Sequence, residues 1–277
     1  MKIMEYPSTA TLSGENILLT DGPKGTQKIL VTDAILAALH LTSVENHKRI
    51  FRGKNLGSTL TSEQKTAIQN GTFEDLWLGD YWVINGVNWR IADFDYWYNV
   101  GDTPFNRHHL VIVPETSIGT GVMNGESTTV GGYVGSQMYT TNMAAAKSAI
   151  ETAFGANLLT HREYLITTMS NGYPSAGEWK DSKIELMNEP MVFGAYINTP
   201  AGNGTVVPKR YTSSGTQLAL FNVAPKFINQ DAAGTRLTYW LRDVVSAERF
   251  ARVTDYGPGT ETAASLEYGI RPIFPIG

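Results

Sequence analysis

The sequence predicts an α+β protein built mainly of short antiparallel strands, with few helices and long loops. Its composition suits such a fold: of 277 residues only 17% are charged, whereas 27 are glycine and 13 are tyrosine. Glycine supplies the turns of loop-rich β proteins, and aromatic residues are favoured in strands. The clearest local signal is Asn85-Gly86, the dipeptide of a two-residue hairpin turn, which joins predicted strands at 80–84 and 87–94.

Residues 1–50 are predicted to form a small unit of their own. Strands are expected at 16–20 and 26–31, joined by the turn "DGPKG" and followed by a helix that Thr32 or Asp33 caps. A hairpin with one helix buries too little apolar surface to be stable alone. We therefore expect this unit to attach the chain to another protein or to another copy of itself.

The boundary of this first domain is predicted near Ile50, because the segment from Glu45 is the most charged and turn-rich transition in the chain. The second domain then covers 51–277. It is expected to begin with a short helix, since Thr61 and Gln64 have the spacing of a capping box.

Short apolar runs alternate with turns through the rest of the chain. The run "HHLVIVP" is continuous enough for a buried strand. Apolar residues at helical spacing predict a helix over 143–154, after a Thr140-Thr141 cap. The segment 161–169 is ambiguous between a short strand and a short helix, and 172–234 is dominated by turn residues.

Composition also narrows the classes of partner. A formal net charge of −4 without a basic cluster argues against nucleic acid. No apolar run approaches the ~20 residues of a membrane helix, so no membrane insertion is expected. The chain has no cysteine, which excludes disulfides, cysteine-bound metals and a thiol nucleophile, and suits synthesis in a reducing cytoplasm.

Enzyme signatures are absent or incomplete, and the main prediction is a protein that is not an enzyme. "GPKGTQK" lacks the spacing of a phosphate-binding loop, and "GGYVGSQ" lacks the pattern of a nucleophile elbow. Asp93 and Asp95 are two apart on a predicted strand, so their carboxylates are expected to share one face, and Glu185 and Glu189 could lie one helical turn apart. Both spacings permit acid–base chemistry on a glycosidic bond. A carbohydrate-active enzyme is therefore kept as an alternative.

Three consecutive aromatic residues, Tyr96, Trp97 and Tyr98, are candidates for ligand binding. Side chains alternate between the faces of a strand, so not all three can face the core. An exposed ring offers apolar contact area at small entropic cost. The alternative is that this edge packs beneath the long segment 172–234.

Other large side chains are expected to be structural. Trp82, Trp89, Trp240 and Leu241 are predicted to lie in the core, because tryptophan in an apolar strand is usually packed. Arg242 is predicted to form a structural ion pair.

Three segments together resemble the C-type-lectin-like domains of phage tail proteins: "LGDYWVINGVNWRIADFD" from Leu78, "TYWLRDV" from Thr238 and "YGIRPIFPIG" from Tyr268. The opening 29 residues, "MKIMEYPSTATLSGENILLTDGPKGTQKI", resemble the attachment module of phage fibre proteins. The resemblance implies a lectin-like fold in which the terminal strands pair, the last strand lies in the core, and long loops are exposed. Within the last segment, Arg271 is expected to fix a loop through its guanidinium group.

The resemblance also implies a function. We expect a phage tail-fibre or receptor-binding protein, made in the host cytoplasm and carried on the virion, that displays variable loops to a host cell-surface glycan or protein. Other virion proteins are expected to contact 1–50, and family habit suggests a homotrimer. A structural virion component without host binding, such as a decoration or tail-assembly protein, is the main alternative.

No cofactor or metal is expected, because "NEPM" at 188–191 and "YWLRD" depart from the motifs that hold calcium in sugar-binding lectins. Host attachment is therefore predicted to be independent of calcium. The predicted ligand-binding residues are the three aromatic residues above and a group in or near the C-terminal polar loop: Arg249, Arg252, Asp255, Tyr256, Thr260, Glu261 and Tyr268.

Overall fold

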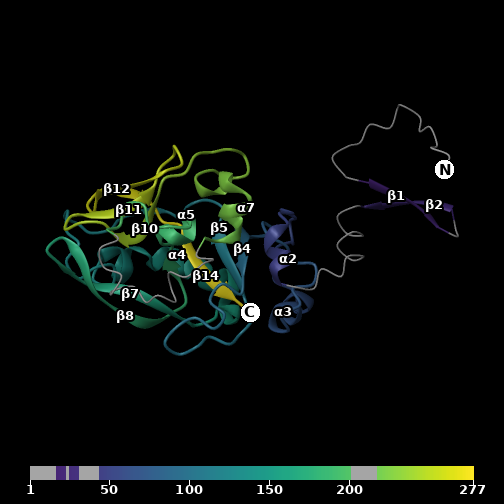
Figure 1. The fold of residues 1–277 in the computed structure, drawn as a ribbon, viewed down its shortest axis with the longest axis horizontal. Helices are drawn as coiled ribbons and strands as arrows, with labels where there is room; N and C mark the ends of the chain where they lie inside the picture. Colours follow the sequence, from purple (N-terminus) through teal and green to yellow (C-terminus); the bar gives the residue numbers. More distant parts are fainter. Residues whose placement is uncertain (1–16, 23–24, 31–43, 201–216) are drawn as a thin grey trace. The chain divides into compact units, whose positions relative to one another are not determined.

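The computed structural model describes residues 17–22, 25–30, 44–200 and 217–277. The chain divides between Ser43 and Val44 into two compact units, a few residues before the predicted boundary at Ile50. In the first unit, β1 (Ile17–Gly22) and β2 (Gly25–Leu30) pair antiparallel, which confirms the predicted hairpin (Figure 1). The helix expected after Thr32 lies outside the described residues.

The larger unit contains two five-stranded sheets. The first has the strand order β3-β4-β5-β14-β9, with β3 (Tyr81–Ile84), β4 (Val87–Phe94), β5 (Leu110–Pro114), β14 (Pro272–Ile276) and β9 (Glu185–Leu186). Positive φ angles of 52° at Asn85 and 76° at Gly86 give the β3–β4 turn the backbone of a type I′ hairpin, as predicted.

The last strand of the chain lies inside this sheet. All five residues of β14 are buried, and the strand pairs with β5 and β9, so the expectation of a terminal strand in the core is confirmed. The expected pairing of the terminal strands is wrong for the larger unit. The first strand of this unit, β3, is only partly buried and pairs with β4. The last strand, β14, pairs instead with β5, which is fully buried and apolar like β14 itself.

The second sheet occupies the region where the sequence indicated a polar loop. Its order is β12-β11-β10-β13-β6, with β12 (Gly259–Ala263), β11 (Arg249–Val253), β10 (Tyr239–Val244), β13 (Glu267–Gly269) and β6 (Thr120–Val122). Most of the predicted loop is therefore a β-hairpin. Its outer strand is rich in threonine and glycine, which hides the strand from a search for apolar runs.

The larger unit also contains a long two-stranded sheet, β7 (His161–Ser170) with β8 (Tyr173–Ser182). The prediction that the first of these segments is short is wrong, because it runs for ten residues. Its turn is a second Asn-Gly pair, with φ of 52° at Asn171 and 80° at Gly172. The sequence therefore carried a second hairpin signal of the same kind as the first.

Among the described residues of the larger unit, the helices are α2 (Val44–Arg49), α3 (Ser62–Gln69), α4 (Ala144–Phe154), α5 (Glu189–Phe193) and α7 (Ala219–Val223), with short π and 3-10 turns. The capping box of Thr61 and Gln64 is confirmed. The Thr140-Thr141 cap is wrong: both residues belong to a π turn that leads directly into α4, whose N-cap is Met143.

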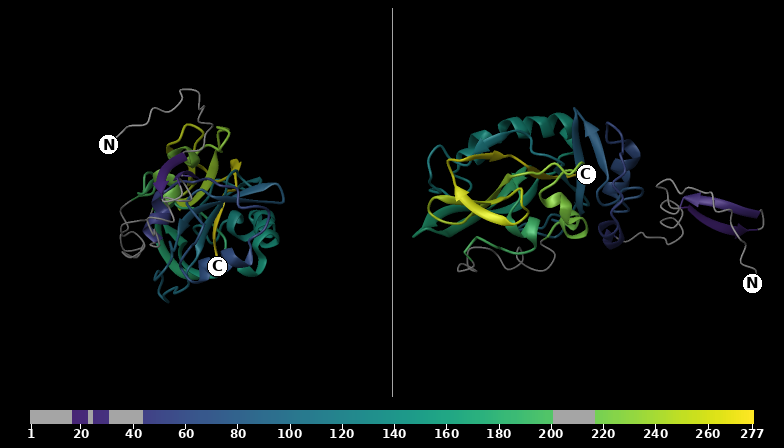
Figure 2. Two further views of the ribbon diagram at one scale, coloured as in Figure 1. Left: turned by 90° about the vertical axis from the view of Figure 1, so that its right-hand side faces the viewer. Right: turned by 90° about the horizontal axis from the view of Figure 1, so that it is seen from above.

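Aromatic side chains fill the space between α4 and the first sheet. The ring of Phe154 lies 5.6 Å from that of Trp89 and 5.3 Å from that of Phe274. Figure 2 shows α4 lying along one side of the larger unit. The four residues predicted for the core are all buried, at 1% exposure or less.

Within the described parts of the chain, every helix is too short or too polar to cross a lipid bilayer.

Candidate functional site

Trp97, predicted as an exposed ligand contact, is buried with 1% of its surface accessible. Its ring lies 4.1 Å from that of His161 and 5.9 Å from that of His109. These residues are not on a strand, because β4 ends at Phe94 and Asp95 then takes a φ of 52° that turns the chain away. The prediction that not all three rings face the core is nevertheless confirmed, since Tyr98 is exposed. Trp97 is therefore part of the core and is removed from the predicted contacts.

The two neighbours of Trp97 differ in their surroundings. Tyr98 is exposed, and its ring stacks on that of His108 at 4.9 Å. Tyr96 is half-buried against the core, and burial raises the pKa of its hydroxyl well above the usual value, with a smaller contribution from the charge of Asp93. Tyr98 is thus the most exposed residue of the aromatic triplet.

The C-terminal group divides between two faces of the β11–β12 hairpin. Arg249 and Glu261 form an ion pair of 3.3 Å. Arg252 lies opposite Thr260 in the register, and its guanidinium group lies 4.3 Å from the centre of the Tyr268 ring. Residues 249 and 252 are three apart on a strand, so these two pairs point to opposite faces.

The turn between β11 and β12 holds the remaining two predicted contacts. Tyr256 is 80% exposed at this turn. The backbone carbonyl of Asp255 accepts hydrogen bonds from Asn229 (2.8 Å) and Arg236 (2.6 Å), which tie the turn to the segment before β10. The predicted set is thus spread over separate surfaces.

Sequence reasoning missed a second group of exposed side chains, at turns that contact one another. Thr129 donates its backbone N–H to the carbonyl of Ala247 (2.9 Å), and Gly172 lies against the same residue. The hydroxyl groups of Ser127 and Ser265 are 2.9 Å apart.

Three apolar or aromatic side chains project from these turns: Val130, Tyr173 and Leu266, which are 78%, 52% and 46% exposed. We call them the tip cluster. The Asn171-Gly172 pair could have located Tyr173 beside a hairpin turn, whereas the contacts between the turns have no local signal.

The acidic pair on β4 does not converge. Asp93 accepts the backbone N–H of Ala219 (2.9 Å) and pairs with Lys48 (3.3 Å), whereas Asp95 is hydrogen-bonded to the ring of His108 (2.7 Å). We predicted that both carboxylates share one face of a strand. That prediction is wrong, because the register shifts before Asp93 and the strand ends before Asp95.

The second acidic pair is also divided, because Glu185 lies on β9 and Glu189 begins α5. Glu185 accepts hydrogen bonds from the hydroxyls of Tyr133 (2.9 Å) and Ser182 (2.6 Å). Glu189 accepts the backbone N–H groups of 197–199. The predicted spacing of one helical turn is therefore wrong, and each carboxylate has its own partners.

A buried ion pair joins β7 to β10, and it confirms the structural role predicted for Arg242. The guanidinium group of Arg242 lies 2.9 Å from Glu163, which is also 3.2 Å from Nε2 of His161. Burial by itself raises the pKa of Glu163. The charge of Arg242 and the hydrogen bond with His161 outweigh burial and lower that pKa to about 2.

The next residue along β10, Asp243, has the opposite electrostatic character. One of its oxygens accepts the backbone N–H of Glu189. Burial raises the pKa of Asp243 to about 8, the charge of the Glu189 side chain adds to the rise, and Arg242 opposes it. Asp243 is thus a protonated, neutral carboxyl group at pH 7.

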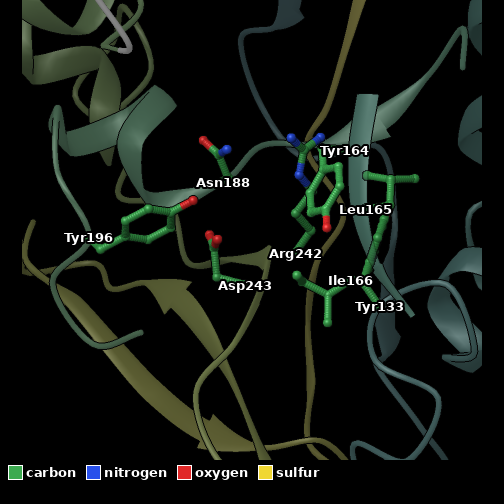
Figure 3. A pocket seen from close by; sticks show the side chains of 8 residues that line it. All are labelled: Tyr133, Tyr164, Leu165, Ile166, Asn188, Tyr196, Arg242 and Asp243. Carbon is green, nitrogen blue, oxygen red and sulfur yellow. The ribbon is translucent and has the colours of Figure 1, made fainter. Parts of the chain in front are cut away.

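Asp243 lies in a small cleft between β7, β10 and the start of α5 (Figure 3). Residues 164–166 of β7 line one side of the cleft, and Asn188 and Tyr196 line the opposite side. Arg242 and Asp243 of β10 lie between them. The cleft is narrow, with a cavity volume of about 30 Å³, the space of about one water molecule.

Asn188 lines the cleft and is also the N-cap of α5. Its Oδ1 accepts the N–H of Met191 (2.8 Å), and Pro190 lies in the first turn. The "NEPM" segment is therefore a helix start. Within the described residues, no three His, Asp or Glu side chains gather as a set of metal ligands.

Comparison with known proteins gives no match: no family model, curated protein or solved structure is similar to this chain.

Proposed function

We propose that this chain is a phage virion surface-fibre or receptor-binding protein. In this proposal the first unit attaches the chain to the particle, and the larger unit binds a glycan or protein on the host surface. Weak contacts of each copy would be multiplied in a homotrimer, where several copies bind at once.

The observation that carries the proposal is the placement of the exposed turns in the larger unit. The chain enters this unit at α2, and both ribbon views place the β7–β8 turn toward the opposite end from α2 and α3 (Figures 1 and 2). An attachment point at one end and projecting hairpins at the other is the geometry that display requires.

The chemistry of the tip cluster supports the same proposal. Tyr173 and Leu266 expose apolar surface among the hydroxyl groups of Ser127 and Ser265. Side chains with few rotatable bonds, held on hairpins, lose little entropy when they bind. Hydroxyl groups at their margin supply hydrogen bonds that orient a ligand.

The test is binding of the purified full-length protein to intact candidate host cells and to their isolated wall polysaccharide. We expect the double substitution Tyr173→Ser with Leu266→Ser to weaken binding at least tenfold, about 1.4 kcal/mol. The matched control is Val223→Ser, because Val223 is an exposed apolar residue on α7, which packs against α2. Chelation of calcium should leave binding unchanged.

The same assay tests the surface predicted from the sequence, through Tyr256→Ala combined with Glu261→Ala. Loss of binding in this variant alone would place the contact on the β11–β12 hairpin. Absence of binding across the host panel, with the protein still present on particles, would replace the proposal with a structural virion role. Cleavage of the polysaccharide would replace it with a carbohydrate-active enzyme.

A further inference from the structure

We propose that the tip cluster binds a cationic protein segment, one in which lysine or arginine side chains lie beside apolar ones. This inference rests on the proposed function and deepens it, because it names the chemistry of the host ligand that the tip cluster contacts. Three features of the tip support it. The apolar side chains are exposed on fixed turns, acidic side chains lie at their margin, and the cation beside them is already paired.

The turn that carries Val130 is fixed against β7. Gly132 has a φ of 63° and donates its N–H to the carbonyl of Thr129 (2.9 Å). A Cβ atom at Gly132 would lie 2.5 Å from the backbone oxygen of Ile166, so glycine allows this close approach. Val134 donates its N–H to that same oxygen (3.1 Å). Val130 is therefore held in place although it is 78% exposed, and little conformational entropy is lost when a partner covers it.

The side chains of the tip cluster suit a protein better than a glycan. Val130 and Leu266 are aliphatic, so a sugar hydroxyl placed against them would lose its hydrogen bonds to water. Apolar side chains of a protein can pack on them without that loss. Tyr173 adds an aromatic ring, a residue type that is enriched in protein–protein interfaces. An apolar centre with a polar margin is also the usual arrangement of such interfaces.

Three glutamates lie at the margin of the tip cluster. Glu126, Glu248 and Glu267 are all exposed, and each lies in or directly beside one of the turns at this end. These turns contact one another: the carbonyl of Glu248 accepts the N–H of Ala264 (2.9 Å), and the carbonyl of Ala264 accepts the N–H of Asn124 (3.0 Å). We call the three glutamates the acidic rim.

The acidic rim is not neutralised by cations of the described turns. These turns are residues 123–132, 170–175, 245–249 and 263–267. Arg249 is the one lysine or arginine within them, and it pairs with Glu261 at 3.3 Å. Glu267 accepts a hydrogen bond from the hydroxyl of Thr120, which is uncharged. A surface of this kind attracts a cationic partner and repels an anionic one, such as a polyanionic wall polymer.

The first experiment selects ligands from a library of random linear peptides on immobilised full-length protein. We expect the enriched peptides to combine lysine or arginine with apolar residues and to carry a net positive charge. A parallel selection uses the variant with Tyr173→Ser and Leu266→Ser, which should not enrich them. No enrichment on wild type, or enrichment of neutral or acidic peptides, would overturn the proposal. Enrichment of the same peptides on both proteins would overturn the assignment to the tip cluster.

The second experiment titrates the most enriched peptide into charge variants by calorimetry. Replacing all three glutamates of the acidic rim with glutamine should weaken binding about tenfold, because three exposed charge interactions are lost. This difference from wild type should shrink as salt is raised, since exposed charges are screened. The matched control replaces Glu45, Glu74 and Glu151 with glutamine, which removes the same charge from exposed positions outside the turns of the tip. Equal weakening in both variants would overturn the role of the rim.

A third experiment, on intact host cells, separates this inference from host attachment. Trypsin cleaves after lysine and arginine, so treating the cells with trypsin and washing it away should abolish binding. Oxidation of the cell-surface glycans with periodate should leave binding intact. Binding that survives trypsin but is lost after periodate would overturn the protein ligand, and host attachment would stand. Absence of binding to every host, with the peptide results as expected, would overturn host attachment alone.

Discussion

Arg271 shows how one buried side chain connects distant parts of this fold. Its guanidinium group donates to the backbone carbonyls of Pro114 (3.0 Å), Phe227 (2.9 Å) and Ile228 (3.2 Å), and it lies 5.0 Å from the centre of the Tyr239 ring. A planar group with several fixed donors suits this arrangement better than a lysine ammonium does. Arg271 thus holds the end of β5 and the turn after α7 against the start of β14.

The Arg242 and Asp243 pair is the other residue-scale feature, and it leads to a prediction about pH. Folding raises the pKa of the Asp243 carboxyl group from 3.8 to about 8. The unfolded chain therefore loses this proton near pH 4, whereas the folded chain keeps it. Between these pH values the folded state binds more protons, so this group makes the folded protein less stable as pH rises.

We predict that Asp243→Asn removes this part of the pH dependence. The free energy of unfolding of the variant, relative to that of wild type, should increase steadily from pH about 5 to about 8. It should not increase further above that range. Urea unfolding of both proteins across the range measures the difference. Glu163 gives the opposite sign: its pKa is lowered to about 2, so its contribution is present at neutral pH and is lost as pH falls below about 4.5. Parallel stability curves for the two proteins would show that Asp243 is not buried in its neutral form.

At the scale of elements, two hairpins use the same turn chemistry in different surroundings. Asn85-Gly86 joins β3 to β4 in a five-stranded sheet, whereas Asn171-Gly172 joins the two-stranded β7–β8. A Cβ atom at Gly86 meets nothing within 4 Å, and at Gly172 only ordinary contacts with Ala247. Any effect of a substitution at these glycines therefore comes from the positive φ and not from crowding.

We predict that Gly86→Ala and Gly172→Ala have the same local penalty, about 1–2 kcal/mol, but different consequences. Gly86→Ala should lower global stability, because the β3–β4 hairpin belongs to the five-stranded sheet that also contains the fully buried strand β14. Gly172→Ala should mainly raise hydrogen exchange in β7 and β8 near the turn. Gly125→Ala is the control, since a Cβ there makes only an ordinary contact, at 3.5 Å. Equal global destabilisation by the two substitutions would show that β7–β8 unfolds together with the rest of the unit.

The elements also show what could be predicted from the sequence. Three features that local signals predict are confirmed. They are the hairpin turn at Asn85-Gly86, the capping box that begins at Thr61, and the buried strand β5, which is a continuous apolar run. The β11–β12 hairpin was missed because one of its strands is polar at the sheet edge. The cleft was missed because its lining joins Asn188, Tyr196 and Asp243, which are far apart in the chain and have no shared pattern.

At the scale of the whole molecule, the division between the units determines how the chain can be dissected. Contacts place the division between Ser43 and Val44, so α2 belongs to the larger unit. His47 of α2 is buried, its Nδ1 lies 2.7 Å from the carbonyl of Leu76, and its ring stacks on Trp77 at 4.4 Å. Charge and turn composition predict a boundary near Ile50, because the sequence alone does not show that this helix packs on the larger unit.

We predict that a chain beginning at Val44 folds as the full-length protein does, whereas one beginning at Phe51 is less stable. The first truncation leaves the contacts of His47 in place, so its main unfolding transition should stay within about 0.5 kcal/mol of the full-length value. The second removes a buried imidazole and its ring contact, and should lose about 2–4 kcal/mol. Urea unfolding followed by tryptophan fluorescence measures both, and His47→Ala in the full-length chain separates the loss of this side chain from the loss of α2. If the two truncations are equally stable, α2 contributes nothing to the larger unit and the division lies near Ile50.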